Sequence, residues 1–340
     1  MQPGLAAAPP DPGIIFETLL AHQRSAALRA AIELNVFGAV GEGPAGAATL
    51  AERCSSSPRG IRILCDFLVI MGLLVKDGDV YSHTPTSAQF LDPHSPTSLH
   101  TTARFLGLAE MRSTYDDLTE IVRNGRTVLP GQGTVEPDNP AWVEFAHGMA
   151  PMMAPLAGPL GKMVLQGRMD FMKVLDIAAG HGLFGIEIAR QNPNAQIVAL
   201  DWAKVLDVAE ENARKAGVSD RYQRLAGSAF DVDFGGPYDA ALLTNFLHHF
   251  DAPTCIGLLR KVRHALKPGG ISATLEFVPN EDRVSPPMAA GFSLTMLVST
   301  ASGDAYTFSE LEAMHLEAGF QDVQAEAVPK SPHTVVTAVA

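Results

Sequence analysis

Two adjacent histidines and a glutamate are the first candidates for catalysis. His248 and His249 follow an apolar run that predicts a buried strand, and Glu276 lies late in the next predicted strand. A neutral imidazole can take a proton near pH 7, and a carboxylate bonded to one ring nitrogen leaves the other nitrogen free as the base. Neighbours on a helix project about 100° apart, so we expect only one histidine to point into a site. These residue types predict general-base chemistry; the alternatives are a structural histidine and a glutamate that meets water.

A glycine turn between an apolar strand and a helix is the candidate for ligand binding. The segment Val174–Ala189 predicts a strand, a turn containing Gly180 and Gly182, and a helix packed on the sheet. Glycines lack side chains, so the backbone of this turn can approach a ligand closely. Asp176 ends the strand, and we expect it to face the crevice in which open α/β sheets bind ligands.

Two cofactors compete for this turn. Gly180, Gly182 and Gly185 match G-x-G-x-x-G, and Asp201 follows about 20 residues later, as in a dinucleotide site. The ammonium and sulfonium of S-adenosylmethionine (SAM) would be stabilised by Asp176, whereas a pyrophosphate would not. Asp201 ends the next predicted strand, where its carboxylate suits the two hydroxyls of a ribose. We therefore predict SAM, with NAD and a turn without a ligand as alternatives.

Composition argues against several classes of protein. The chain has 340 residues, of which 46% are hydrophobic, and this predicts a globular protein with two domains. A net charge of −12 argues against nucleic acid or an anionic membrane as a partner. The start of the chain does not resemble a signal peptide and no apolar run is long enough for a membrane span, so we expect a cytoplasmic protein. The three cysteines lack metal-ligand spacing, and we predict no metal.

The N-terminal part of the chain predicts a winged-helix domain. Helices are expected at Ala26–Val40, Thr49–Cys54 and Ser57–Leu74, followed by a β-wing at Val75–His83. Many such domains bind DNA, but residues 1–100 hold 6 basic and 9 acidic side chains, and the third helix is mostly apolar. We therefore predict a dimerisation module and a homodimer, with a ligand-sensing regulator as the alternative.

From Lys173 onward, predicted strands and helices alternate. Strands are expected near 173–178, 196–201, 221–226, 238–244 and 270–278, which predicts an α/β fold with a doubly wound, Rossmann-like sheet. The preceding segment Leu99–Leu165 predicts helices rich in large apolar side chains, which either form plain core or line a pocket for a flat aromatic molecule. The predicted pocket residues are Trp142, Phe145, Met149, Met153, Phe292 and Met296.

These residues resemble the SAM-dependent O-methyltransferases of the plant caffeate and animal acetylserotonin type, and above all uncharacterised bacterial members. The resemblance covers nearly the whole chain. It implies a winged-helix dimerisation domain at 1–100, a helical linker lining the substrate pocket at 101–165, and a class I methyltransferase domain at 166–340. It also implies that His248 is the base, in a Leu-His-Asp-Trp-like segment with Phe250 in place of the tryptophan, and that Glu276 orients it.

Beyond the Leu247–Phe250 segment, three more positions depart from the family pattern. Ala178 replaces the first glycine of the D-x-G-x-G-x-G turn, and Ser228 replaces the acid that contacts adenine, where a hydroxyl binds more weakly than a carboxylate. The second glutamate that flanks the base in the plant enzymes falls near Phe308.

Trp202 either lies against adenine or is a half-buried aromatic at a strand end. The predicted cofactor residues are Asp176, Gly180, Gly182, Asp201, Trp202, Ser228, Phe230 and Asn245.

The combined prediction is a homodimeric enzyme that methylates a hydroxyl of a small, largely apolar metabolite. The methyl donor is SAM and the acceptor is aromatic or polyketide-like. The alternatives are an NAD-dependent oxidoreductase and a SAM-binding relative that catalyses a pericyclic or decarboxylative step without methyl transfer.

Overall fold

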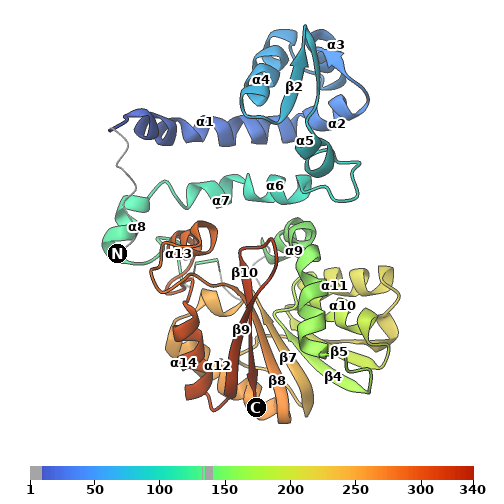
Figure 1. Ribbon diagram of the computed structural model, residues 1–340, viewed down its shortest axis with the longest axis vertical. Coiled ribbons are helices and arrows are strands. Elements are labelled where there is room, and N and C mark those ends of the chain that lie inside the picture. Colours follow the sequence, from blue (N-terminus) through green and yellow to red (C-terminus); the bar gives the residue numbers. More distant parts are fainter. Residues whose placement is uncertain (1–9, 132, 135–140) are drawn as a thin grey trace. The chain divides into compact units, whose positions relative to one another are not determined.

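The computed structural model describes residues 10–131, 133–134 and 141–340 of the chain. Contacts divide the chain into two compact units, residues 1–108 and 109–340, and each is considered by itself (Figure 1). Within the described ranges, no helix is both long and apolar enough to span a bilayer.

The first unit combines helices with a small antiparallel sheet. Its strands β1 (Ala45–Gly46), β2 (Leu74–Asp77) and β3 (Val80–His83) lie in the order β1-β3-β2. The strands β2 and β3 form the predicted wing, which turns at Gly78 with a φ of 55°. The helices are α1 (Gly13–Glu33), α2 (Val36–Gly41), α3 (Ala47–Arg53), α4 (Pro58–Ile70), α5 (Pro85–Phe90) and α6 (His100–Leu106).

Two helices of this unit differ from the sequence prediction. The single helix expected at Ala26–Val40 is divided between α1 and α2, because Asn35 adopts a left-handed φ of 54° between them. The helix α4 ends at Ile70 rather than Leu74, because Gly72 has a φ of 75° and turns the chain toward β2. The start of α4 is fixed by the Ser57 hydroxyl, which accepts a hydrogen bond from the Gly60 backbone N–H.

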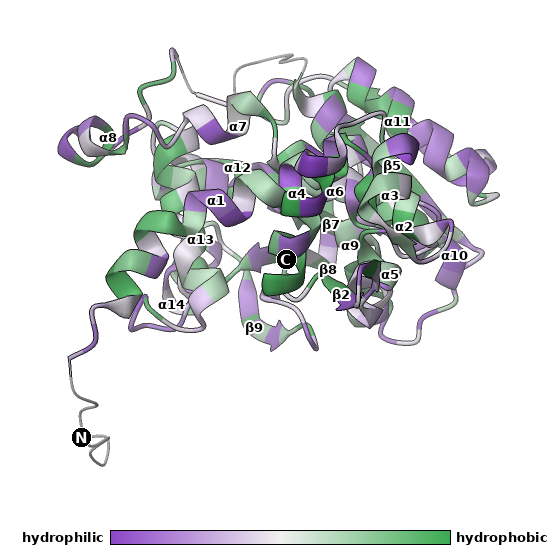
Figure 2. Ribbon diagram, turned by 90° about the horizontal axis from the view of Figure 1, so that it is seen from above, coloured by the Kyte–Doolittle hydropathy of each residue, from purple (hydrophilic) through white to green (hydrophobic). Residues whose placement is uncertain are grey.

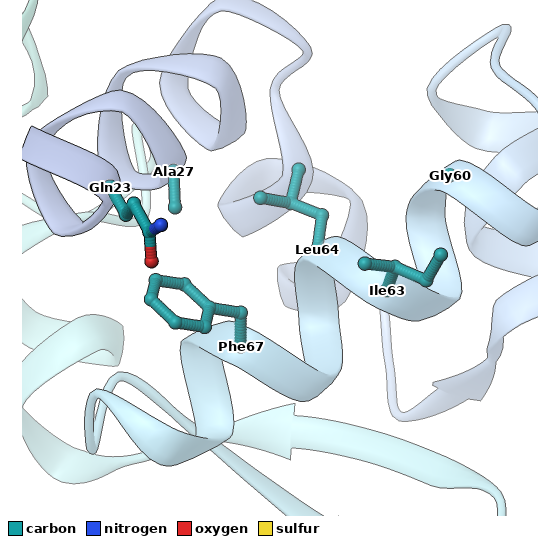
Figure 3. A pocket seen from close by; sticks show the side chains of 6 residues that line it. All are labelled: Gln23, Ala27, Gly60, Ile63, Leu64 and Phe67. Carbon is teal, nitrogen blue, oxygen red and sulfur yellow. The ribbon is translucent and has the colours of Figure 1, made fainter. Parts of the chain in front are cut away.

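Apolar surface on α1 is exposed in this chain. Between α1 and α4 lies a groove of about 340 Å³, and Figure 3 shows Leu64 and Phe67 of α4 close to Gln23 and Ala27 of α1 along it. A monomeric protein rarely leaves a large contiguous apolar patch in water. The exposed apolar side chains at the N-terminal end of α1 are Ile14, Ile15, Phe16, Leu19 and Leu20.

The second unit contains a seven-stranded sheet in the order β6-β5-β4-β7-β8-β10-β9. The five strands from β6 to β8 are parallel, and β10 is antiparallel to both of its neighbours. The strand order reverses between β4 and β7, which is where open α/β sheets bind ligands. The strands are β4 (Met172–Ile177), β5 (Ala195–Asp201), β6 (Tyr222–Ala226), β7 (Tyr238–Thr244), β8 (Leu266–Phe277), β9 (Gln321–Ala327) and β10 (His333–Val339).

Amphipathic helices cover this sheet, and the α/β prediction is confirmed. In α11, for example, Val205, Leu206 and Ala209 are buried while the charged side chains face outward, so the helix shows both hydrophobic and hydrophilic turns in Figure 2. The helices are α7 (Ala109–Ser113), α8 (Leu118–Asn124), α9 (Ala141–Leu165), α10 (Leu183–Gln191), α11 (Ala203–Lys215), α12 (Ala252–Ala265), α13 (Pro287–Ser299) and α14 (Phe308–Glu317), with 3₁₀ turns η1 (Ser219–Arg221) and η2 (Leu247–His249).

The segment after β7 differs from the prediction of one helix running from the histidines to Leu266. The two histidines lie in the 3₁₀ turn η2, and α12 begins only at Ala252. Asp251 separates the two elements, because its carboxylate caps α12 by accepting a hydrogen bond of 2.9 Å from the Thr254 N–H. The helix α12 ends at Ala265, so Leu266 already belongs to β8.

Candidate active site

A buried pair formed by His248 and Glu276 lies where β7 and β8 run side by side. His248 follows β7 in η2, and Glu276 is the penultimate residue of β8. The His248 Nδ1 and Glu276 Oε2 atoms are 2.5 Å apart, and the two side chains are only 6% and 4% exposed. The sequence predicted this pairing, and the structure brings both residues together.

Glu276 is held by the backbone as well as by the imidazole. Its other oxygen, Oε1, accepts hydrogen bonds from the N–H groups of Phe246 at 3.0 Å and Leu247 at 2.9 Å. Each carboxylate oxygen is therefore paired, which removes the main cost of burying this side chain. With the His248 Nδ1–H donating to the carboxylate, Nε2 is the nitrogen with a free lone pair.

His249 lies beside His248 and is half-buried, and the expectation that only one of the two rings points into a site stays a prediction. The ring centroids are 4.3 Å apart at an interplanar angle of 62°, and the His249 ring also meets the Trp142 ring at 5.7 Å. Burial lowers the pKa of His249 well below its ordinary value, and the neighbouring His248 lowers it further. The His249 ring is therefore neutral at physiological pH.

Asp176 does not face an open crevice, contrary to the sequence prediction. Its side chain is fully buried, and Oδ2 accepts a 3.1 Å hydrogen bond from the Gly185 N–H at the start of α10. Burial raises the pKa of Asp176 to about 7, and the negative charge of Asp201 adds to this rise. The carboxylate lies beneath the glycine turn. Its hydrogen bond to the Gly185 N–H supports a role in holding the start of α10 against β4.

The glycines of the turn differ in what they contact. A Cβ added at Gly182 would lie 2.5 Å from the Tyr222 hydroxyl, and one added at Gly185 would lie 2.8 Å from Asp176 Oδ2. Gly182 and Gly185 must therefore be glycines, because a larger residue would collide with the side chains of Tyr222 and Asp176. Gly180 has a φ of 56° and open space around it, so it leaves room for a ligand. Ala178 also has a positive φ, 53°, at the position where the family pattern has a glycine.

Asp201 ties the end of β5 to the turn. Its Oδ2 accepts from the Gly180 N–H at 2.8 Å, and its Oδ1 accepts from the Trp202 N–H at 2.7 Å. Burial raises the pKa of Asp201 to about 6. A carboxylate oxygen has a second lone pair, so these bonds leave capacity for ribose hydroxyls.

The remaining predicted cofactor residues occupy three different settings. Ser228 Oγ accepts from the Phe230 N–H, and the Phe230 ring is exposed and packs edge-on against Phe250. Trp202 packs against an apolar cluster that includes Val205. Asn245 has a left-handed φ of 53°, and its buried Oδ1 has no hydrogen-bond partner among the residues that the structure describes.

Three of the six predicted pocket residues contact this group directly. Trp142 meets His249, Phe292 meets the His248 ring at 4.9 Å, and Met153 Sδ accepts a weak hydrogen bond from Asn245. Phe145 packs edge-on against Trp142 at 5.5 Å. Met149 and Met296 are buried, and the described contacts do not bring them to the histidines.

Sequence reasoning missed three residues of this region. His181 lies within the glycine turn, where its Nδ1 accepts a hydrogen bond from the Leu183 N–H at 3.2 Å, and no sequence signal points to this contact. Tyr222 lies beneath Gly182, and His333 of β10 packs its ring 4.1 Å from that of Phe277. Both depend on strand register, which no local pattern predicts. Within the described ranges, no cluster of three or more potential metal ligands is present.

Comparisons with known proteins give a consistent result. Residues 144–321 match the model of an O-methyltransferase domain, and residues 16–93 match that of an O-methyltransferase dimerisation domain. The tetracenomycin polyketide 8-O-methyltransferase of Streptomyces glaucescens is 29% identical over 321 residues, covering 93% of this chain and 94% of that protein.

Solved structures agree with these sequence matches. The crystal structure of a Nostoc punctiforme protein, whose own O-methyltransferase assignment is provisional, is 47% identical with a TM-score of 0.94, covering 98% of this chain and 100% of that chain. Human N-acetylserotonin methyltransferase in complex with SAM shares the fold at 24% identity and a TM-score of 0.85, covering 98% of this chain and 99% of that chain.

Proposed function

We propose, from the premise that this chain belongs to the O-methyltransferase family, that it transfers the methyl group of SAM to a hydroxyl of a small aromatic metabolite with His248 as general base. The observation that carries the role of His248 is its bond to Glu276, which is itself fixed by two backbone N–H groups. The alternative of an NAD-dependent oxidoreductase is not retained, because the family uses SAM.

The residues around the glycine turn fit the cofactor. SAM, when bound, supplies a methyl group on a positively charged sulfonium. Asp201 has lone pairs free for ribose hydroxyls, and the open space at Gly180 lets the cofactor approach the main chain of the turn closely. The buried Asn245 Oδ1 lacks a partner in the described part of the chain and sits at the end of β7, where it can accept a hydrogen bond from an ammonium. An unpaired buried acceptor is costly in the empty protein, so a ligand that pairs it gains affinity.

His248 takes the proton from the acceptor hydroxyl in this proposal. Glu276 holds Nδ1–H, so Nε2 is presented as the base and the resulting imidazolium is stabilised by the carboxylate. A phenol has a pKa of about 10 and histidine about 6.5, so proton transfer is uphill before methyl transfer begins.

Apolar side chains around the histidines support an aromatic acceptor. The Phe292 ring meets His248 edge-on and stacks on Phe277 at 4.0 Å, which fixes its position. Trp142 borders His249, and Met153 adds a flexible thioether beside Asn245. A flat aromatic ring would find apolar contact from two helices, α9 and α13. The Streptomyces glaucescens relative is named for polyketide synthesis, which supports the polyketide-like acceptor predicted from the sequence.

A homodimer is part of the proposal. The match to a dimerisation domain covers α4 and α1 from Phe16 onward, and these helices carry the groove of Figure 3 and exposed apolar side chains such as Phe16 and Leu19. Pairing two chains through this unit would remove that apolar surface from water.

A variant series tests the role of His248. A general base contributes about 10²–10⁴-fold, so His248→Ala is expected to lower kcat by that factor while the SAM dissociation constant changes less than about 3-fold. Glu276→Gln should lose less, because the base remains but its tautomer is no longer fixed. The matched control is His264→Ala, since His264 is an exposed histidine of α12 whose Nδ1 bonds to the Arg260 carbonyl of the same helix. A His248→Ala enzyme with nearly full turnover would show that the histidine is structural.

A further inference from the structure

His249 differs from the other histidines that are buried or half-buried. The rings of His83, His100, His181, His248, His315 and His333 each make at least one hydrogen bond. His249 makes none with the residues that the structure describes, and its Nδ1 is completely buried. The Nε2 atoms of His315 and His333 are also buried without a partner, but each of those rings is anchored through Nδ1. His249 has no such anchor, so hydrogen bonding within the described part of the protein does not account for a histidine at this position.

The position of His249 is tightly fixed. A Cβ at Gly303 would collide with the His248 carbonyl oxygen and lie 3.0 Å from the His249 carbonyl carbon, so the chain after α13 presses directly on η2. The ring packs between His248 on one side and Trp142 on the other. Its unpaired nitrogen is therefore held beside the proposed base and beside an aromatic wall of the proposed acceptor site.

We propose that His249 is a specificity-determining residue that binds a second oxygen substituent of the acceptor, on the ring carbon next to the one bearing the methylated hydroxyl. This inference rests on the proposed function. Two oxygens on neighbouring ring carbons can each reach one of two adjacent imidazoles, so the first meets His248 while the second meets His249. The acceptor class is an aromatic hydroxyl with a vicinal hydroxyl, carbonyl or carboxylate.

The neutral ring explains why more than one second substituent is allowed. An uncharged imidazole has one N–H donor and one acceptor nitrogen, and either nitrogen can carry the proton. The neutral His249 ring can therefore accept a hydrogen bond from a hydroxyl or donate one to a carboxylate. The family pattern has an aspartate at this position, and an ionised aspartate can only accept and would repel a carboxylate. The histidine in this chain thus widens the acceptor class to anionic aromatic acids.

Calorimetry on the full-length protein with S-adenosylhomocysteine bound tests this by affinity rather than turnover. The probes are 2-naphthol, 2,3-dihydroxynaphthalene and 3-hydroxy-2-naphthoate, which differ only in the second substituent. Wild type is expected to bind each of the last two about 5-fold or more tighter than 2-naphthol. In His249→Phe the affinity of 2,3-dihydroxynaphthalene and of 3-hydroxy-2-naphthoate, each relative to 2-naphthol, should approach one. In His249→Asp the diol should keep its advantage while the naphthoate loses it. His264→Phe is the matched control and should keep the wild-type ratios.

Several results would overturn the inference. These are a wild-type protein that does not distinguish the three probes, a His249→Phe protein that keeps the wild-type ratios, and failure of all three probes to bind. Equal binding of the naphthoate by wild type and by His249→Asp would also refute it. Thermal melting checks that the variants are folded, and His249→Asn supplies a second polar replacement if His249→Phe is not. The expected affinity pattern without any methylated product would refute the proposed function and leave the role of His249 standing.

Discussion

Replacing Asp176 with asparagine is expected to stabilise the protein at neutral pH. The carboxylate is fully buried, and one of its oxygens has no hydrogen-bond partner in the described part of the chain. Burial raises its pKa from the ordinary value of 3.8 to about 7. At about 1.36 kcal/mol for each unit of pKa, full ionisation in the folded state costs about 4 kcal/mol. The amide introduced by Asp176→Asn carries no charge and still offers an oxygen to the Gly185 N–H.

The pH dependence of this effect has a definite sign. Below pH 3.8 the carboxyl group is protonated in both states, so its charge costs nothing. Between 3.8 and about 7 the unfolded chain has released the proton while the folded chain retains it, so the folding free energy of wild type weakens as the pH rises. Above about 7 the cost is constant. The advantage of Asp176→Asn over wild type should therefore grow by about 3 kcal/mol between pH 5 and pH 8.

Urea denaturation of the ligand-free protein at pH 5 and pH 8 measures this difference. Asp231→Asn is the matched control, because Asp231 is exposed, and it should change stability by less than about 0.5 kcal/mol at both pH values. The SAM dissociation constant should change less than about 10-fold in Asp176→Asn, because Asp176 lies beneath the turn. An advantage that does not vary with pH, or an Asp176→Asn protein that is less stable at pH 8, would refute this account of Asp176.

Three further predictions follow from the same structure. Ala178→Gly should raise stability by up to about 1 kcal/mol in thermal melting, because Ala178 has a φ of 53°, and no gain would mean that this position is not strained. Gly185→Ala should lower stability by roughly 1–3 kcal/mol because the new Cβ meets Asp176 and Ile197, whereas Gly257→Ala, with open space in helix α12, should lose nothing; equal effects would contradict the packing. The double variant Phe16→Glu/Leu19→Glu should be monomeric by light scattering at a concentration where wild type is dimeric, and an unchanged mass would exclude α1 from the interface.

The sheet of the second unit could be predicted because its strands are continuous apolar runs bounded by turn residues. Val174 and Ile197, for example, are buried on strands β4 and β5, whose register pairs them. The His248 and Glu276 pairing was also predictable, because both residues lie at the carboxyl ends of the neighbouring parallel strands β7 and β8. Here the order of elements along the chain determines which residues meet.

The errors lie where side chains meet in three dimensions. The burial of Asp176 depends on how closely α10 approaches β4 through Gly185, and no sequence pattern gives that distance. The two histidine rings meet because they lie in the 3₁₀ turn η2. The backbone of this turn packs against Gly303, which is more than fifty residues away in the sequence. A helix rule for neighbouring residues could not anticipate either contact.

The most direct test of His248 as a base compares two acceptors that differ in acidity. One is a phenol with a pKa of about 10, and the other is a nitrophenol of similar size that is already ionised at pH 8. If His248 removes the proton, His248→Ala should lower kcat about 10²–10⁴-fold for the first acceptor and less than about 10-fold for the second. Equal losses for both acceptors would contradict the account, because the histidine would then be needed for something other than proton transfer.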